Sequence, residues 1–444
     1  MQYSEPILKA VKNIRGGVIL PFKKKTAENP SEILPLPQKV VIPMLQHTGA
    51  PCNPIVKRGD TVYVGTKIGD SEELASAPVY SSVSGTVTAI GSIVLPSGEE
   101  CETVEITSDG LMILASEIKP CSFENCDELI NAIRESGITD LYEPLHIKLQ
   151  AVLDNRTETL IINCIEPQPY LTGNYRECIE NAQNILEGAY LLKEYFGFKE
   201  VIICVEETGL NVIEALNKAI DDNQKANNIK VMALKPKYPI GNEKMLIFSA
   251  VGKKMLLNKQ PMDVGCVVIN VNTASALNSF VKTGVPPLSK RITVDGNAIK
   301  EPKNVIAPIG TIANDVLEFC GLKTYPKKVV YGGPMNGVAA SSTDMPIVKQ
   351  SDAILVFGRK AAEKPEQLNC IGCGRCAAVC PMKLRPFEIV KAQSKGKLEA
   401  IKKLYSDHCI ECGCCSYICP SKRDVIGAVC LAKAKLAEEE VRED

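Results

Sequence analysis

Two short stretches near the C-terminus decide the fold of that part of the chain: residues 370–381, CIGCGRCAAVCP, and residues 409–420, CIECGCCSYICP. Both have the spacing C-x2-C-x2-C-x3-C-P. Three thiolates at this spacing surround one [4Fe–4S] cluster, while the fourth cysteine reaches the other cluster. The sequence therefore predicts two clusters. One is held by Cys370, Cys373, Cys376 and Cys419, and the other by Cys409, Cys412, Cys415 and Cys380.

Other uses of these cysteines fit the pattern less well. Structural zinc favours paired C-x2-C knuckles separated by a spacer, and disulfides are rare in a reducing compartment. Such clusters carry one electron at a time, commonly near roughly −400 mV. Cys414 interrupts the second motif, and we predict a thiol beside the cluster, with replacement of Cys415 as the alternative.

Eleven further cysteines are scattered along the chain, which has nineteen in all. Dispersed thiols are mostly small buried hydrophobes. Cys52 lies in a turn between two prolines, where a structural cysteine and a redox thiol are the two interpretations. His47 and His146 are predicted to be hydrogen-bonded loop residues rather than ligands, and His408 is expected simply to precede the second cysteine motif.

The overall composition is that of an ordinary soluble protein. The chain has 444 residues, of which 45% are hydrophobic and 23% charged, with a formal net charge of −1. This charge gives no general attraction to nucleic acid. The sequence has no run of 18 apolar residues and no charged-then-apolar leader. We expect a cytoplasmic protein, with peripheral docking at the cytoplasmic membrane left open.

Turn chemistry and periodicity divide the rest of the chain. Short strands with close turns over 37–115 predict a small β module after an N-terminal segment, 1–36. Residues 120–258 alternate apolar strands with helices at 127–136, 177–196 and 210–219, which predicts a parallel sheet. Ligands of such sheets bind beyond the carboxyl ends of the strands, here the loops 163–172, 206–209 and 235–243. Residues 259–357, with a strand at 264–271, return to β structure, and 360–444 hold the cysteine motifs.

Several motifs outside the cysteine stretches resemble the RnfC-like family of electron-transport subunits. They lie at residues 15–18, 46–52, 56–60, 77–85, 237–244, 270–273, 301–304 and 332–335. The resemblance implies a multidomain α/β protein. Its parts are a barrel-sandwich hybrid at 37–115, a Rossmann-like flavin domain at 120–258, an SLBB-like β-grasp module at 259–357 and a ferredoxin-like two-cluster domain at 360–444.

The same resemblance implies a cofactor site. In the family, FMN takes hydride from NADH and passes single electrons to the clusters, because a flavin can handle both one and two electrons. The positions that carry over to this sequence as cofactor-binding residues are Glu166, Tyr170, Lys237, Asn270, Asn272 and Thr273. The sequence assigns no catalytic residue.

The sequence departs from the family where the flavin would bind. A glycine-rich loop of the form GLGGAGFP is replaced by residues 137–146, GITDLYEPLH, and the second glutamate of the E-x-E-P-Y-L-T motif is Gln168. Bulky side chains obstruct the close approach that glycine permits. These losses suggest a divergent paralogue, such as the proline-reductase-associated branch, and they weaken the expectation of NADH more than that of FMN.

Two functional interpretations remain open. In the first, a redox protein relays electrons through both clusters to a partner, either a soluble reductase or membrane-bound Rnf-type subunits, and its enzyme form oxidises NADH at FMN. In the second, the chain is a non-enzymatic iron–sulfur wiring and docking adaptor without flavin.

Overall fold

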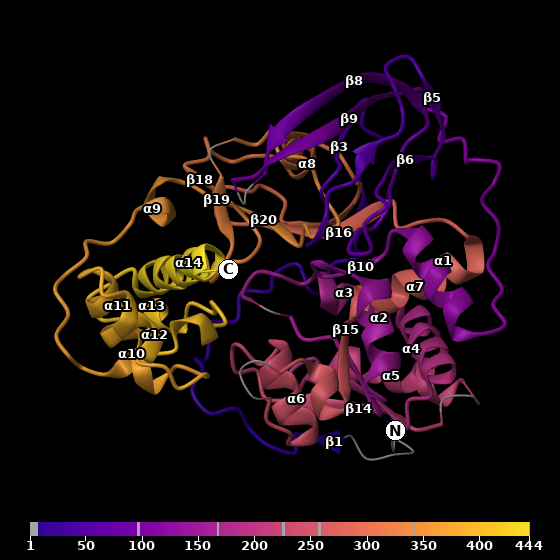
Figure 1. Ribbon diagram of the computed structural model, residues 1–444. Coiled ribbons are helices and arrows are strands. Elements are labelled where there is room, and N and C mark those ends of the chain that lie inside the picture. The colour runs from indigo at the N-terminus through magenta and orange to yellow at the C-terminus, as the bar shows by residue number, and fades with distance from the viewer. Residues whose placement is uncertain are drawn as a thin grey trace.

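The computed structural model describes residues 8–443 apart from 96–97, 167, 224–226, 256–258 and 341. Pro167, part of the loop that carries Glu166 and Gln168, lies outside the described residues. Figure 1 shows an α/β region, a β region beside it, and a helical C-terminal region that lies to one side of both.

The α/β region is built on a five-stranded sheet in the order β1-β14-β13-β12-β15. Every pair in it is parallel, as the sequence predicted. Along β12, Leu160 and Ile162 face one core, and Ile161 faces a second core on the other side. Burial on both faces explains why the strands are continuous apolar runs. The strands are β1 (Leu8–Lys9), β12 (Thr159–Asn163), β13 (Glu200–Glu206), β14 (Ile229–Leu234) and β15 (Cys266–Asn270).

Helices cover both faces of this sheet (Figure 1). Apolar residues of six helices share the larger core: α1 (Cys126–Ser136), α2 (Leu145–Asp154), α3 (Gly173–Glu180), α4 (Ala182–Phe196), α5 (Leu210–Asp221) and α7 (Val271–Thr283). The opposite core is closed by α6 (Glu243–Val251) and the 3₁₀ helix η1 (Pro261–Val264).

The single helix predicted over 177–196 is wrong, because the segment forms two helices. These are α3 (Gly173–Glu180) and α4, and they meet at Asn181. Asn181 has a φ of −130°, outside the helical range, and its N–H caps the first helix by donating to the Glu177 carbonyl. Asparagine favours such cap positions because its short polar side chain competes with the helical backbone for hydrogen bonds.

The boundary predicted between 258 and 259 is also wrong, because the next strand belongs to the parallel sheet. β15 pairs along its whole length with β12. The helix α7 that follows it was not predicted, and it packs on α4 through Ala274 and Leu277. The apolar run at 264–271 fits either sheet, so only the tertiary pairing decides its place.

Residues 39–108 form the small β module with close turns that the sequence predicted. A four-stranded sheet, β3-β9-β8-β5, and a three-stranded sheet, β4-β6-β7, enclose one apolar core. The strands are β3 (Lys39–Pro43), β4 (Asn53–Pro54), β5 (Thr61–Val62), β6 (Lys67–Asp70), β7 (Val79–Tyr80), β8 (Gly85–Val94) and β9 (Glu100–Ser108).

A further, mixed sheet of six strands has the order β19-β18-β20-β16-β17-β2. Its core is closed by α8 (Ala313–Cys320), which matches the predicted helix over 313–319. The strands are β2 (Glu32–Ile33), β16 (Ser289–Asp295), β17 (Lys303–Pro308), β18 (Lys328–Tyr331), β19 (Val338–Ala340) and β20 (Ala353–Phe357).

The C-terminal region is helical and follows a long connection after α9 (Arg359–Ala362) (Figure 1). Its helices share one apolar core through residues such as Ile389, Ile401 and Val429. They are α10 (Arg375–Ala378), α11 (Pro386–Gln393), α12 (Leu398–Lys403), η2 (Ser406–His408), α13 (Cys414–Tyr417) and α14 (Val425–Glu443). Within the described part of the chain, no helix is long and apolar enough to cross a membrane.

The N-terminal segment ties the three regions together. Its first strand, β1, pairs with β14 of the parallel sheet, and β2 pairs with β17 of the mixed sheet. Between them, the Gly17 N–H donates to the Val379 carbonyl of the C-terminal region over 2.7 Å. A segment that contacts all three regions fixes the cysteine motifs relative to the α/β region.

Candidate functional site

The two cysteine motifs fold into loops with the same backbone. We call residues 370–376 the outer loop and residues 409–415 the inner loop. Positive φ angles recur at equivalent positions, at Gly372 (69°) and Gly374 (70°) in the outer loop and at Glu411 (55°) and Gly413 (75°) in the inner loop. A short helix follows each loop, α10 and α13 respectively. This correspondence agrees with the internal repeat expected from the sequence.

Each loop surrounds a cavity together with the fourth cysteine of the other motif. Cys370, Cys373 and Cys376 line a cavity of about 300 Å³ with Cys419. Cys409, Cys412 and Cys415 line one of about 20 Å³ with Cys380. We call these four-cysteine groups the outer set and the inner set. Among the described residues, no three His, Cys, Asp or Glu side chains converge closely enough to hold a single metal ion.

The inner loop packs against the rest of the chain. The Tyr238 hydroxyl donates to the Cys412 carbonyl over 2.7 Å. Gly413 lies so close to Met335 that a Cβ atom at this glycine would stand 2.7 Å from the Met335 carbonyl oxygen. The outer loop has no such contact, and nothing lies within 4 Å of a Cβ atom built at Gly374. The inner set therefore faces the body of the chain, and the outer set faces away from it.

This asymmetry predicts different effects of the same substitution in the two loops. Gly374→Ala is expected to cost about 1 kcal/mol from its left-handed backbone alone. Gly413→Ala adds a clash with Met335 and is expected to loosen the C-terminal region from the body. Limited proteolysis of the connection 359–369 measures this, and it should be faster only in Gly413→Ala. Equal rates in both variants would contradict the packing described.

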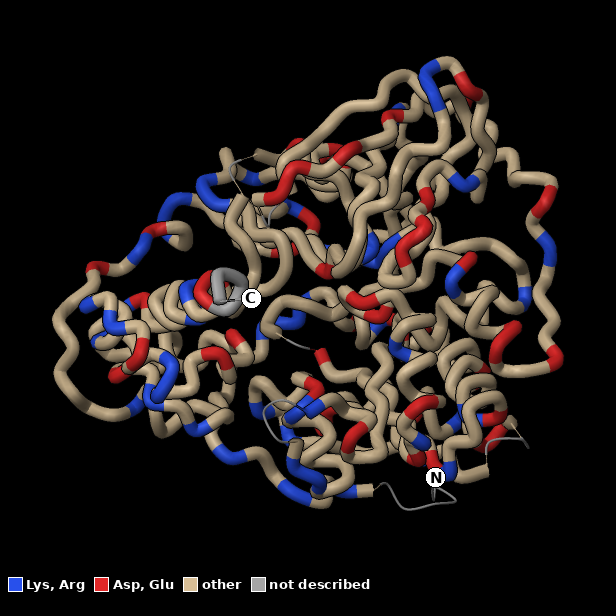
Figure 2. The backbone as a smooth tube through the Cα atoms, in the orientation of Figure 1, with Lys and Arg blue, Asp and Glu red and all other residues tan. Residues whose placement is uncertain are grey.

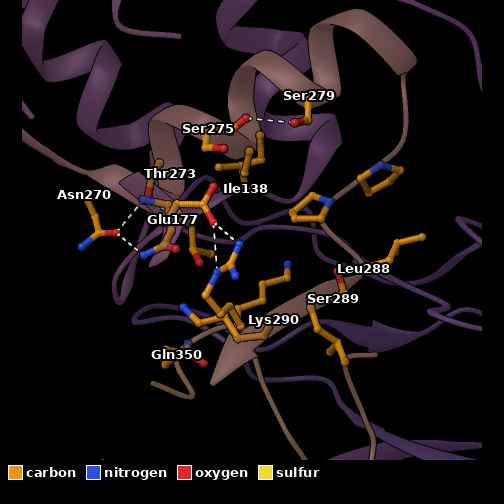
Figure 3. Close-up of a pocket in the computed structure, with 18 of the residues that line it drawn as sticks. Ile138, Glu177, Asn270, Thr273, Ser275, Ser279, Leu288, Ser289, Lys290 and Gln350 are labelled. Atoms are coloured by element: carbon orange, nitrogen blue, oxygen red, sulfur yellow. Dashed lines mark hydrogen bonds and ion pairs between the residues drawn. The ribbon is translucent and has the colours of Figure 1, made fainter. Parts of the chain in front are cut away.

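Polar groups gather where β12 and β15 end, at a site that we call the cleft. The replaced glycine loop forms a small hairpin of β10 (Thr139–Asp140) and β11 (Glu143–Pro144) beside it. At the hairpin tip, Leu141 has a φ of 55° and lines two cavities. One has a volume of about 390 Å³, with α7 and β16 in its walls (Figure 3), and the other about 80 Å³.

An acid of this hairpin is bound by a buried cation and a backbone N–H beside the cleft. The buried Asp140 carboxylate accepts the Asn270 N–H over 2.8 Å and the Lys148 ammonium over 2.9 Å. Lys148 also contacts Glu243 at 3.3 Å. These carboxylates raise the pKa of Lys148 against the opposing effect of its burial, so it stays charged. The carboxylate of the chain itself thus neutralises the buried cation next to the cleft.

The other cations that line the larger cavity are engaged as well. Arg291 pairs with Glu177 at 2.9 Å, and Lys290 pairs with Asp352 at 3.4 Å. Burial lowers the pKa of Lys349 to about 8, and its amine donates to the backbone carbonyls of Pro78 and Gly137. Arg291, Lys290 and Lys349 thus each have a partner within the chain already. None of them is left free to bind a phosphate group in this cavity.

The structure brings together some of the predicted cofactor residues and not others. Asn270, Asn272 and Thr273 line the larger cavity, and Glu166 lines the smaller one with the two asparagines. Tyr170 and Lys237 line neither cavity. The Tyr170 ring packs edge-on against Phe357, and Lys237 lies within 3.5 Å of the Ile14 carbonyl.

Glu166 is a buried carboxyl whose titration can be tested. Burial is the main cause that raises its pKa to about 7, and nearby Lys24 and the N–H of Tyr175 oppose the shift. The unfolded state, with an ordinary glutamate pKa near 4.5, loses its proton first as pH rises. The native chain is thus progressively destabilised between pH 4.5 and 7, by up to about 3 kcal/mol.

Glu166→Gln should remove this penalty, since an amide oxygen can still accept the Tyr175 N–H. We expect the variant to unfold at a higher temperature than the wild type at pH 8 and at nearly the same temperature at pH 4.5. Scanning fluorimetry at both values measures this, with the exposed Glu214→Gln as the control. A variant that is less stable at pH 8 would show that the carboxylate is needed charged.

The residues around the cleft do not fit a flavin phosphate. The glycines that would allow close approach are absent, Leu141 lines both cavities, and Asp140 neutralises Lys148. The smaller cavity, about 80 Å³, is also too small for an aromatic ring system, since ligand pockets usually measure about 300 Å³ or more.

Several residues of these sites escaped the sequence analysis. Gln168 was noted only as a loss, yet its carbonyl oxygen accepts the Met335 N–H over 2.7 Å. Met335 in turn contacts Gly413 of the inner loop. The cleft loop thus reaches the inner set through two contacts. Each contact joins segments far apart in sequence. The only signal in the sequence that could have pointed to these residues is that they lie in or beside the family-like motifs at 332–335 and 166–172.

The scattered cysteines are mostly buried, as expected. Cys52, Cys101, Cys164, Cys178, Cys204, Cys266, Cys320 and Cys414 are buried, and Cys121, Cys126 and Cys430 are half-buried. Burial raises the pKa of Cys52, whose thiol donates to the Ala77 carbonyl over 3.2 Å, so a structural cysteine fits better than a reactive thiol. His47 accepts the Ala77 N–H, as expected of a hydrogen-bonded loop residue. His146 contacts the Leu74 carbonyl, but the prediction of a loop residue is wrong there, because His146 lies in helix α2.

Three family models match the chain. The RnfC barrel sandwich hybrid domain matches residues 12–111, the Nuo51 FMN-binding domain residues 133–279, and the 4Fe-4S dicluster domain residues 369–423. The second match extends through β15 and most of α7, in agreement with the sheet. The third confirms the sequence prediction of a domain that binds two [4Fe–4S] clusters.

Curated relatives resemble the chain over nearly its whole length. The C subunit of the proton-translocating ferredoxin:NAD(+) oxidoreductase complex of Clostridium ljungdahlii is 37% identical over 89% of this chain and 88% of its own. The C subunit of the Na(+)-translocating complex of Acetobacterium woodii is 36% identical, over 95% and 96%. The chain belongs to the RnfC family. The resemblance drawn from the sequence is thereby confirmed.

This RnfC-family chain also resembles a solved structure. An NAD+-reducing [NiFe]-hydrogenase in the air-oxidized state aligns with a TM-score of 0.52, at 15% identity, over 70% of this chain and 66% of that one. The likeness at this identity concerns the fold alone.

Proposed function

We propose that this chain is an electron-transfer subunit of the RnfC type. In this proposal two [4Fe–4S] clusters pass electrons one at a time between the body of the chain and a partner. The outer set holds one cluster, and the inner set holds the other. The single observation that carries the proposal is the gathering of eight cysteines in two groups of four, each lining its own cavity.

The roles of the surrounding residues follow from their contacts. Thiolate sulfur binds the iron, and backbone N–H groups stabilise the charge on sulfur. The Glu411 N–H already points at the Cys409 sulfur over 3.4 Å. Tyr238 and Met335 hold the inner loop against the body, so they fix the distance over which an electron must move.

The relatives suggest the setting. Two of them are named as subunits of ferredoxin:NAD(+) oxidoreductase complexes that translocate ions. We propose that this chain works as a peripheral subunit of such a complex at the cytoplasmic side of a membrane, with a soluble reductase as the alternative partner.

The domain assignment belongs to the same proposal. We assign residues 37–115 to a barrel-sandwich hybrid and 360–444 to a ferredoxin-like domain. A Rossmann-like domain would cover 120–283, extended to the end of α7, and an SLBB-like β-grasp module the rest up to residue 357. The parallel order of the five strands supports the Rossmann-like assignment, and α8 packed on a mixed sheet supports the β-grasp assignment.

A redox titration of anaerobically purified protein tests the proposal. We expect two one-electron reductions per chain at low potential, with the absorbance and spin signals of [4Fe–4S] clusters. Uptake of fewer than two electrons per chain, or a spectrum typical of zinc-substituted or iron-free protein, would contradict it.

A second candidate function is oxidation of NADH at a bound FMN. The match to the Nuo51 FMN-binding domain and the 390 Å³ cavity favour it. The engaged cations and the acid at the cleft argue against it. We therefore place the relay first and propose that the residues of the cleft serve as a scaffold.

A further inference from the structure

The surroundings of the outer set point to its partner, if the proposed relay is right. Cys370 and Cys373 are exposed, whereas the cysteines of the inner set are half-buried or buried. The inner loop is covered by Tyr238 and Met335. An electron leaving or entering the chain from outside therefore meets the outer set first.

The surface around the outer set combines apolar and basic side chains. Leu368 (58%), Ile371 (70%) and Phe387 (38%) are exposed large hydrophobic residues. Ile371 and Phe387 line the 300 Å³ cavity, and so do three cations, Arg375, Lys391 and Arg423. No Asp or Glu lines it. Among the described residues, none of these three cations forms an ion pair with the chain itself.

The charge of the whole C-terminal region has the same sign. Residues 368–430 contain ten Lys and Arg and five Asp and Glu, a balance of +5, and the whole region 360–444 contains fifteen and twelve, a balance of +3 in a chain whose net charge is −1. Figure 2 shows these Lys and Arg positions spread over the region to the left. A positive field of this kind attracts an acidic partner over distance and speeds its encounter.

We propose that this face is the docking surface for a small acidic one-electron carrier protein of the ferredoxin type. We call the face, defined by Leu368, Ile371, Arg375, Phe387, Lys391 and Arg423, the outer face. A small apolar centre ringed by unpaired cations suits a transient contact, because charge steers the approach and little area is buried. An electron then passes between the outer cluster and the carrier, so that one is oxidised as the other is reduced.

The test uses the full chain and an acidic two-cluster bacterial ferredoxin as the probe. The chain, reduced beforehand, is mixed with the oxidised ferredoxin, and the bimolecular rate of electron transfer is followed at low and high salt. The wild-type rate should fall about tenfold or more between low and high salt. The triple variant R375E/K391E/R423E should be slower by about tenfold or more at low salt and should lose most of the salt dependence.

A matched control reverses three exposed cations far from the outer face, K57E/R58E/K119E. This variant changes the net charge equally and should keep the wild-type rate within about twofold. Equal slowing of both variants, or a wild-type rate independent of salt, would overturn the proposal. So would binding of the chain to vesicles of anionic phospholipid that R375E/K391E/R423E abolishes while its rate with ferredoxin is unchanged, since the face would then contact a membrane.

Failure of the relay itself gives a different result. Iron content and reduction by dithionite are measured for every variant before mixing. A wild-type chain that takes up no electrons would contradict the proposed function. A chain that is fully reduced but does not react faster with the acidic carrier at low salt would contradict only the docking surface.

Discussion

Replacing Cys419 by serine is expected to destroy the outer cluster and leave the inner one, although Cys419 lies in the second motif. The prediction follows from the crossed arrangement, in which Cys419 lines the cavity of Cys370, Cys373 and Cys376. Replacing Cys380 should instead destroy the inner cluster and leave the outer one, because Cys380 lines the cavity of the inner set. Each variant should lose about half of roughly eight irons per chain.

The loss can be assigned to one cluster by comparison with a variant inside each loop. Cys373→Ser should give the same remaining spin signal as Cys419→Ser, and Cys412→Ser the same as Cys380→Ser. Iron analysis and electron paramagnetic resonance of the reduced, anaerobic proteins measure this. If Cys419→Ser instead matched Cys412→Ser, each cluster would be held by a single motif and the crossed assignment would be wrong.

Cys414→Ser is the matched control, since this cysteine lies next to a ligand. It is buried, and its sulfur lies 4.0 Å from the Tyr238 carbonyl oxygen. A neighbouring thiol that is not a ligand can be replaced without loss of iron, so both signals should persist. Loss of the inner signal in Cys414→Ser, with Cys415→Ser unaffected, would mean that Cys414 has taken the place of Cys415.

The sequence predicted best those features that depend on local spacing. The four-cysteine sets follow from two identical spacings, and the parallel strands follow from apolar runs such as 159–163 and 200–205. The break at Asn181 was missed, because helical periodicity continues across it. Strand β15 was placed in the wrong sheet because a short apolar run does not reveal its neighbour.

Contacts between distant segments could not be predicted from the sequence. The sequence showed that bulkier and acidic residues replace the glycines at 137–146. It did not show that Asp140 would be bound by Lys148 and by the Asn270 N–H. The contact of Met335 with Gly413 could not be predicted from the sequence either. This contact is what makes one cysteine set the inner one and the other the outer one. The pattern gives the residue types, and only the tertiary structure shows which charges already have partners.

The second large expected result is that the purified chain carries no functional flavin. Anaerobically purified chain should release far less than one flavin per chain on acid extraction, and NADH should leave the cluster absorbance unchanged. The physical reason is that Asp140 neutralises Lys148 and accepts the Asn270 N–H, while the hairpin side chain of Leu141 lines the cleft. A phosphate that bound Lys148 or the Asn270 N–H would have to displace the buried Asp140 carboxylate, which is costly without a new cation.

The isosteric variant Asp140→Asn tests this cause directly. The amide can still accept the Asn270 N–H, but it releases the charge of Lys148 from its nearest partner. We expect FMN to bind the variant about tenfold more tightly than the wild type, a difference of about 1.4 kcal/mol, measured by quenching of flavin fluorescence. Asp127→Asn, an exposed acid in the first turn of α1, is the control and should bind FMN as the wild type does. One tightly bound flavin per wild-type chain, with clusters bleached by NADH, would instead favour the enzymatic interpretation, and the carboxylate of Asp140 would then have to move aside when FMN binds.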